Sequence, residues 1–120
     1  MSIIKLFIHF QGSKSEKTMP SLFDSQATYS CINAADALRI AEITPLRKSK
    51  TVLISGKLIE TNAVCLLDFY INDGLFSDEF LVAPNLQESV VFGATTIRKW
   101  RIELDYQHNT IDAKKVHHRI

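Results

Sequence analysis

Residues 21–30 read SLFDSQATYS, which is the most informative stretch of the chain. The apolar residues Leu22 and Phe23 lead into Asp24, and small or polar residues follow. An apolar run is typical of a buried strand, whereas Asp and Ser favour turns because their short side chains bond nearby backbone groups. The stretch therefore predicts a strand that delivers the Asp24 carboxylate and the Ser25 hydroxyl into a tight loop. The plainer interpretation is that Asp24 only closes a turn.

A second apolar stretch lies much further along the chain. Residues 89–92 predict a short buried strand that ends at Gly93, and residues 95–100 can form one or two helical turns after it. The chain thus holds two apolar strands that each end in a residue suited to a turn.

Strands and one helix account for the chain before residue 45. Residues 4–10 alternate with a period of two, and they form a hairpin with residues 18–23 across a polar loop. Residues 34–41 are rich in good helix formers, and Asn33 is a suitable N-cap. We therefore expect one short helix there.

The second half of the chain predicts a meander of strands. Arg47, Lys48 and Lys50 follow a proline and indicate a small solvated basic loop. Residues 72–74 (NDG) are a strong signal for a tight turn. The predicted strands cover residues 52–59, 63–71, 75–82, 101–106 and 110–112. The first of these ranges contains a turn at residues 55–57.

The composition bounds the class of protein. A chain of 120 residues, 46% hydrophobic and 22% charged, fits one domain, which we place at residues 1–112 before a basic tail at residues 113–120. The net charge of +1 lacks the basic field that nucleic acid or an anionic membrane requires. The first residues do not form a signal peptide, and no apolar run approaches the roughly 20 residues that span a bilayer. Cys31 and Cys65 are too few for a disulfide scaffold. We therefore expect a cytoplasmic protein with no nucleic-acid or membrane partner.

The order of hairpin, Asp loop, helix, meander, apolar-Gly segment, helix and strand resembles the retropepsin-like aspartic proteases over residues 3–112. In that family two apolar residues precede Asp, Thr or Ser, Gly and Ala, and a later apolar-apolar-Gly motif packs against the first. Asp24, Ser25 and Ala27 match the first motif, and Gly93 matches the second. The resemblance implies an all-β fold, mainly strands with one or two short helices, in which a closed β-barrel supplies half of a homodimeric active site.

The resemblance also implies catalytic roles. Asp24 would be the catalytic carboxylate, and Ser25 the hydroxyl that bonds across the dimer. Two facing carboxylates cannot both ionise at close range, so they share a proton; one activates water and the other protonates the peptide carbonyl. Because the chain holds one such motif, a two-fold homodimer is needed to bring Asp24 against its copy. The implied function is an aspartic endopeptidase that acts on an extended peptide or protein substrate without a cofactor.

In the family, the substrate lies between the catalytic loops and a flap. The flap should be the hairpin within residues 52–64, which contains one glycine where viral relatives have several. The implied substrate-binding residues are Gln26, Ala27, Thr28 and Gly56.

Gln26 departs from the family motif, which has Gly at this position. Gly lets the backbone approach the carboxylates and the substrate, whereas Gln adds a long side chain and strains the loop if the backbone needs angles open mainly to Gly. The alternative function is therefore a catalytically impaired retropepsin-like module for dimerisation or peptide binding. A third is a β-rich accessory domain without a cleft.

Two further sets of residues suggest other chemistry less well. His117 and His118 could bind a metal ion, but they lie in a basic tail with no Cys or carboxylate at zinc-ligand spacing. Cys65 as a nucleophile would need a histidine and an activating environment, and its apolar neighbours favour packing in the core. We expect no metal site.

Overall fold

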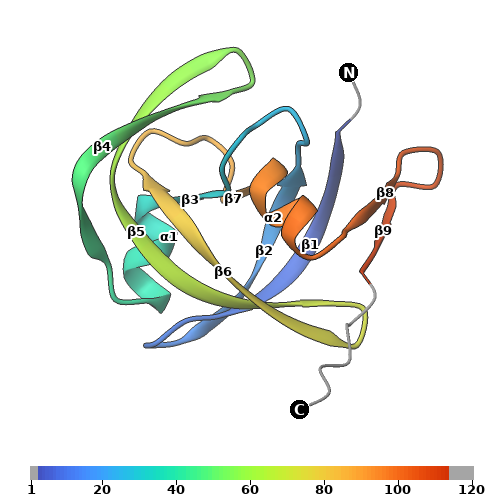
Figure 1. Cartoon of the computed structure of the whole chain (residues 1–120). Helices are drawn as coiled ribbons and strands as arrows, with labels where there is room; N and C mark the ends of the chain where they lie inside the picture. Colours follow the sequence, from blue (N-terminus) through green and yellow to red (C-terminus); the bar gives the residue numbers. More distant parts are fainter. Residues whose placement is uncertain (1–2, 114–120) are drawn as a thin grey trace.

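The computed structural model describes residues 3–113, which form nine strands and two short helices (Figure 1). In chain order the elements are β1 (Ile4–Gln11), β2 (Glu16–Phe23), β3 (Cys31–Asn33), α1 (Ala34–Ile40), β4 (Thr44–Ile54), β5 (Lys57–Ile71), β6 (Gly74–Ala83), β7 (Val90–Phe92), α2 (Ala94–Lys99), β8 (Glu103–Asp105) and β9 (Thr110–Asp112).

Six of the strands close into a barrel. They lie side by side in the order β1, β2, β7, β3, β6 and β5, and a short antiparallel pairing of β1 with β5 closes the ring. In this closure Phe10 pairs with Phe69 and Gln11 with Asp68. Within residues 3–113, β4 pairs only with β5, and Figure 1 shows their hairpin arching over one end of the barrel. β8 and β9 form a separate two-stranded sheet.

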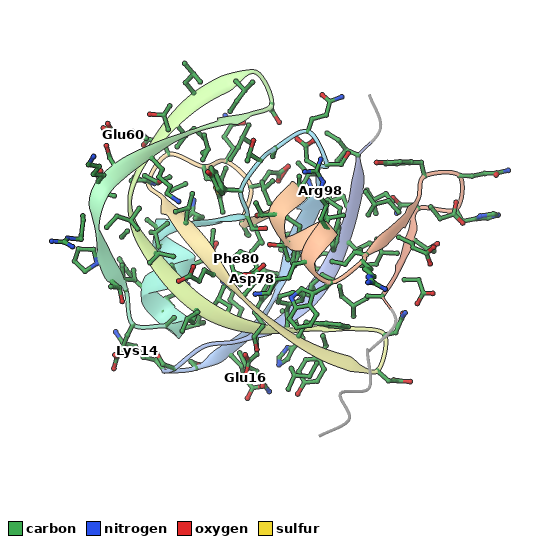
Figure 2. All side chains as sticks on the ribbon, viewed as in Figure 1. Lys14, Glu16, Glu60, Asp78, Phe80 and Arg98 are labelled. Atoms are coloured by element: carbon green, nitrogen blue, oxygen red, sulfur yellow. The ribbon has the colours of Figure 1, made fainter. Side chains whose placement is uncertain are left out.

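Phenylalanines fill the barrel. Phe10 lies 5.8 Å from Phe92 and 5.9 Å from Phe80, measured between ring centroids. Figure 2 shows Phe80 toward the centre of the molecule, with charged residues such as Lys14 and Glu60 at its margin. Burying aromatic rings of this size supplies much of the hydrophobic free energy of a small domain. The fully buried members of this set are Phe10, Phe23, Phe69, Phe80 and Phe92.

The apolar runs in β2 and β7 have a structural cause. Phe23 and Phe92 face the main core inside the barrel, whereas their neighbours Leu22 and Val91 face a second cluster beneath β4. Because successive residues of a strand point to opposite faces, a strand between two cores is apolar throughout. The prediction of two buried strands is confirmed.

The local signals also hold at the helix and the turns. The Asn33 side chain accepts a hydrogen bond of 2.9 Å from the Ala35 N–H, so Asn33 is the N-cap of α1 as predicted. The predicted turn at 55–57 joins β4 to β5, and the predicted turn at 72–74 joins β5 to β6.

Phe92 is fully buried in the main core, and Trp100 and Leu104 are partly buried and pack against it.

The predicted basic loop at Arg47, Lys48 and Lys50 is wrong, because all three residues belong to β4. The pairing of β4 with β5 breaks between Pro45 and Lys50, where β4 bulges away from its partner. The charged side chains are exposed on this edge strand, a position where charges discourage pairing with other chains. Their solvation was predicted correctly, but their backbone was not.

The predicted fold class is confirmed: a closed β-barrel, mainly of strands, with two short helices. No helix in residues 3–113 has the length and apolar character to span a membrane. Residues 114–120 of the predicted tail, with His117 and His118, lie outside the described residues.

Candidate active site

The two apolar strands that the sequence singles out lie side by side. β2 and β7 pair in parallel, with Phe23 opposite Phe92. This register brings Asp24 and Gly93 to the same end of the barrel. The Asp24 N–H donates a hydrogen bond of 3.0 Å to the Phe92 carbonyl, which fixes the start of the Asp24 loop.

Gly93 allows a close backbone approach. A Cβ atom at this position would lie 2.5 Å from the carbonyl carbon and oxygen of Tyr29 and 2.9 Å from the Ala27 oxygen. The next residue, Ala94, donates its N–H to the Ala27 carbonyl at 2.7 Å. The absence of a side chain therefore lets the start of α2 hold the Asp24 loop directly.

A buried hydroxyl pair fixes the far end of the same loop. The Ser30 Oγ accepts a hydrogen bond of 2.9 Å from the Gly93 N–H and lies 2.5 Å from the Thr96 Oγ1. Both hydroxyl-bearing residues are buried. The sequence analysis missed this pair, and its only sequence signal is a polar residue at a position that faces the core.

The Asp24 carboxylate lies in a tight turn. The residue is 4% exposed, and its Oδ1 accepts a hydrogen bond of 3.0 Å from the Gln26 N–H. The Asp24 carbonyl accepts a second bond of 3.1 Å from the Ala27 N–H. Among the described residues, no basic side chain forms an ion pair with Asp24. One backbone donor, the Gln26 N–H, therefore orients the carboxylate group, and no cation in residues 3–113 is paired with it.

A hollow of about 290 Å³ separates the Asp24 loop from the tip of the β4–β5 hairpin. The turn at this tip has φ of 50° at Ser55 and 78° at Gly56, and positive φ at both positions is what a type I′ hairpin turn requires. The predicted flap hairpin and the predicted catalytic loop thus face one cavity. Its lining residues are Asp24, Gln26, Ala27, Leu53, Ser55 and Gly56.

The predicted substrate-binding residues are not all at the hollow. Gln26, Ala27 and Gly56 line it, but Thr28 does not. The Thr28 carbonyl instead accepts a hydrogen bond of 3.0 Å from the Thr95 N–H, and its side chain is exposed.

Leu53 lines the hollow, whereas Ser25 does not. Ser25 follows Asp24 directly and is exposed, but it is not among the lining residues. Leu53, which lines the hollow, is 54% exposed. The sequence analysis missed Leu53 because a leucine in a strand normally indicates core packing.

Gln26 does not adopt a conformation reserved for glycine. Within residues 3–113, positive φ occurs at five positions, and Gln26 is not one of them. The condition for backbone strain at Gln26 is therefore not met. Its side chain is exposed at the hollow, so any effect of Gln at this position comes from the space and polarity of that side chain.

The two cysteine thiols are buried. Burial raises the pKa of Cys31 to about 12 and that of Cys65 to about 11, so both remain protonated at neutral pH. Cys65 packs in the main core, as the sequence predicts. Among residues 3–113, no three His, Cys, Asp or Glu side chains are grouped to hold a metal ion.

No protein-family model matches the sequence, and no curated protein matches it. Solved structures do match the fold. The chain has a retropepsin-like fold, as the closed barrel, the parallel pair of β2 and β7 and the likeness to solved structures show.

Two solved structures illustrate the likeness. The chain is similar to the retroviral protease-like domain of Ddi1 from Leishmania major, with a TM-score of 0.69, 13% identity, and coverage of 97% of this chain and 91% of that chain. It is also similar to EIAV protease, which was solved with the inhibitor HBY-793; here the TM-score is 0.63 and the identity 14%, over 84% of this chain and 90% of that chain. At these identities the likeness establishes the fold.

Proposed function

We propose that this protein is an aspartic endopeptidase that acts as a homodimer on extended peptides. The observation that carries the proposal is the setting of Asp24, a buried carboxylate without an ion-pair partner among the described residues, facing a hollow covered by a hairpin tip. A carboxylate in such a cleft is suited to moving protons. The retropepsin-like fold supports the same assignment.

The chemistry needs two copies of Asp24. One carboxylate takes a proton from water, whose oxygen attacks the peptide carbonyl carbon, while the protonated partner gives its proton to the carbonyl oxygen. The resulting tetrahedral diol then breaks its C–N bond as the leaving nitrogen receives a proton and one hydroxyl returns a proton to the pair. The pair ends with one shared proton, as it began. Ser25 would bond across the dimer and hold the two Asp24 loops together.

The dimer would form around the Asp24 loop and the small β8–β9 sheet. Leu104 and Ile111 of this sheet pack against the main core, but within residues 3–113 its strands pair only with each other. Unpaired strand edges readily accept strands from a second copy. A two-fold axis near Asp24 would make such an interface self-complementary.

The substrate would lie between the Asp24 loop and the β4–β5 hairpin. Gln26, Ala27 and Gly56 line that space, and an extended peptide could bond to backbone groups on either side. Thr28 would contribute through its position in the same loop. The hairpin would then act as a flap.

The exposed Gln26 side chain at the hollow favours one alternative function. The alternative is a retropepsin-like module that binds peptides or dimerises without cutting peptides. Gln26 takes up space that a glycine would leave free. The two functions differ in whether bound peptides are hydrolysed.

The test is peptide hydrolysis by three proteins: the natural sequence, Asp24→Asn, and Asp73→Asn as a control in the β5–β6 turn. A mixed peptide library is incubated at several acidic and neutral pH values, and new termini are identified by mass spectrometry. We expect cleavage to be fastest at acid or mildly acid pH, unaffected by chelators, abolished in Asp24→Asn and retained in Asp73→Asn. Cleavage by Asp24→Asn at the natural rate would remove Asp24 from the mechanism.

Sedimentation of the same proteins tests the homodimer. We expect the dimer fraction to rise with protein concentration in all three, because Asp24→Asn keeps the loop's shape. A strict monomer at high concentration that nevertheless cleaves peptides would refute the shared site.

A further inference from the structure

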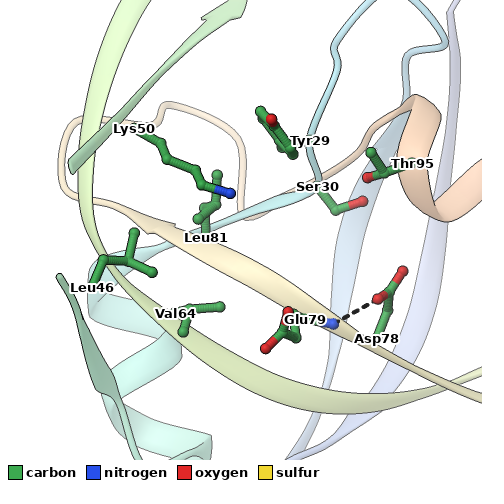
Figure 3. A pocket seen from close by; sticks show the side chains of 9 residues that line it. All are labelled: Tyr29, Ser30, Leu46, Lys50, Val64, Asp78, Glu79, Leu81 and Thr95. Carbon is green, nitrogen blue, oxygen red and sulfur yellow. Dashed lines mark hydrogen bonds between the residues drawn. The ribbon is translucent and has the colours of Figure 1, made fainter. Parts of the chain in front are cut away.

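A second hollow, of about 260 Å³, lies beside the Asp24 loop (Figure 3). β4 connects the two cavities, because Leu53 lines the first and Lys50 lines the second. Tyr29, which lines the second hollow, belongs to the same loop as Asp24. An extended peptide that passes over Asp24 along β4 would therefore carry a side chain into this second hollow, two or three residues away from the Asp24 position.

The bulge in β4 builds one wall of this hollow. Residues 46–49 of β4 lie opposite the single residue Asn62 of β5, and Leu46 and Lys50 at either end of the bulge both line the cavity. The fully buried Thr61 donates its hydroxyl to the Lys50 carbonyl at 2.9 Å, which fixes the backbone of Lys50. The Lys50 ammonium lies 4.7 Å from the centre of the Tyr29 ring.

The opposite wall is acidic and comes from β6. Asp78 and Glu79 both line the hollow, as Figure 3 shows. The Asp78 Oδ1 accepts the Glu79 N–H at 2.8 Å and lies 3.3 Å from the Lys99 ammonium, so Lys99 offsets its charge. Glu79 forms no ion pair among residues 3–113, and neither does Lys50.

The hollow therefore carries a cation and an anion on facing walls, above an apolar floor, and neither has an ion-pair partner among residues 3–113. Val64 and Leu81 provide that floor. A ligand group that fits must be apolar along its stem and must both accept a hydrogen bond from Lys50 and donate one to Glu79. A primary amide has a carbonyl acceptor and an NH₂ donor, and it carries no charge for either wall to repel.

We propose that this hollow recognises a glutamine side chain of the peptide substrate. The proposal rests on the proposed function for its setting, since it places the glutamine two or three residues from the cleaved bond. Glutamine has a two-carbon stem for the apolar floor. A glutamate at the same place would be attracted to Lys50 but repelled by Glu79, a lysine would be attracted to Glu79 but repelled by Lys50, and a leucine would bond to neither. Because a homodimer carries two such hollows, glutamine is recognised on both sides of the cleaved bond.

The experiment uses a synthetic dodecapeptide library in which each position carries equal amounts of Gln, Glu, Lys, Leu and Ala. The natural protein, Lys50→Met and Glu79→Gln are compared with the control variants Lys48→Met and Glu42→Gln, whose residues are exposed and do not line the hollow. Mass spectrometry measures which residues flank the cleaved bonds. We expect glutamine to be favoured about tenfold by the natural protein, as bonds to charged groups imply.

The variants give the decisive readout because a merely structural role would not change side-chain preference. Lys50→Met should shift the preference toward lysine, Glu79→Gln should shift it toward glutamate, and both control variants should keep the preference for glutamine. Unchanged preferences in Lys50→Met and Glu79→Gln would overturn the proposal.

The same library also separates this proposal from the proposed function. If no protein cleaves any peptide, the endopeptidase assignment fails, and the library is instead passed over each immobilised protein and the retained peptides are sequenced. Retention of glutamine peptides that depends on Lys50 and Glu79 supports the recognition site independently. Equal retention of Gln, Glu, Lys and Leu peptides overturns it.

Discussion

The rings of Phe23 and Phe92 stack with their planes parallel and their centroids 4.4 Å apart. Each residue is the last of its strand, one position before Asp24 and Gly93 respectively. The contact therefore joins the two strands at the point where the candidate site begins. Both rings are fully buried, so the stack also belongs to the main core.

Phe92→Ala should destabilise the fold by about 3–5 kcal/mol, because it leaves a cavity among buried aromatic rings. Urea unfolding followed by circular dichroism measures the change. Phe7→Ala is the matched control, since Phe7 is 75% exposed, and its effect should stay within about 0.5 kcal/mol. Similar costs for the two variants would contradict the assignment of Phe92 to the core.

Gly93→Ala should lower the free energy of unfolding by about 1–3 kcal/mol, because the new Cβ meets backbone atoms of Tyr29 that cannot move independently. Gly56 provides the contrast: no atom lies near its Cβ position, but its φ is 78°. Asn tolerates that region of φ, so Gly56→Asn should be nearly neutral whereas Gly93→Asn should be at least as damaging as Gly93→Ala. Thermal unfolding of the three variants gives the comparison, and tolerance of Asn at both positions would refute the close approach at Gly93.

Gln26→Gly should raise peptide cleavage by about tenfold, which corresponds to about 1.4 kcal/mol of transition-state stabilisation, and Gln26→Ala should raise it to a similar extent. The reason is that the Gln26 backbone is outside the positive-φ region, so only removal of the side chain from the hollow matters. The measurement is kcat/KM on one peptide at several acidic pH values. Improvement by Gly alone would indicate backbone strain instead, and equal rates for all three proteins would mean that the loop accommodates Gln.

The two buried thiols should make the fold less stable at alkaline pH. An unfolded thiol titrates near 9.0, whereas burial raises the pKa of Cys65 to about 11 and that of Cys31 to about 12. The unfolded chain thus loses these protons first, so stability from the protonated thiols is complete below pH 9 and falls as pH rises from about 9 toward 12. Urea unfolding at neutral and alkaline pH should show this slope, and a Cys31→Ala, Cys65→Ala double variant should flatten it. A slope that the double variant leaves intact would assign the effect to other groups.

Local chemistry explains which parts of the fold were predictable. The N-cap at Asn33 could be predicted from the sequence because the cap is formed by a side chain and a backbone N–H only two residues away. The end of β2 and the whole of β7 were predictable because Leu22 and Phe23, like Val90–Phe92, lie between two cores and are apolar on both faces. The β4 bulge could not be predicted, because three basic residues after a proline indicate a loop. They belong to a strand because β4 pairs with β5 on both sides of the bulge, at Pro45 and at Lys50.

Some residues of the candidate site could be predicted from the sequence and others could not. Asp24 and Gly93 could be predicted as site residues because the apolar residues before each of them form a local pattern. The link from Ser30 to Thr96 and Gly93 could not, because it joins residues far apart in sequence whose side chains carry no distinctive pattern. The opposed charges of Lys50 and Glu79 were hidden for the same reason, since their placement depends on a bulge in one strand and on the pairing of two others.

The hydrogen bond from the Asp24 N–H to the Phe92 carbonyl has a consequence for biosynthesis. Most of the chain lies between these two residues, so a growing polypeptide carries Asp24 long before it carries β7. Until β7 is made, the strand that ends at Asp24 lacks its parallel neighbour and the loop lacks the anchor at Gly93. The Asp24 loop can therefore reach its final shape only after β7 has been made, which places its completion late in the synthesis of the chain.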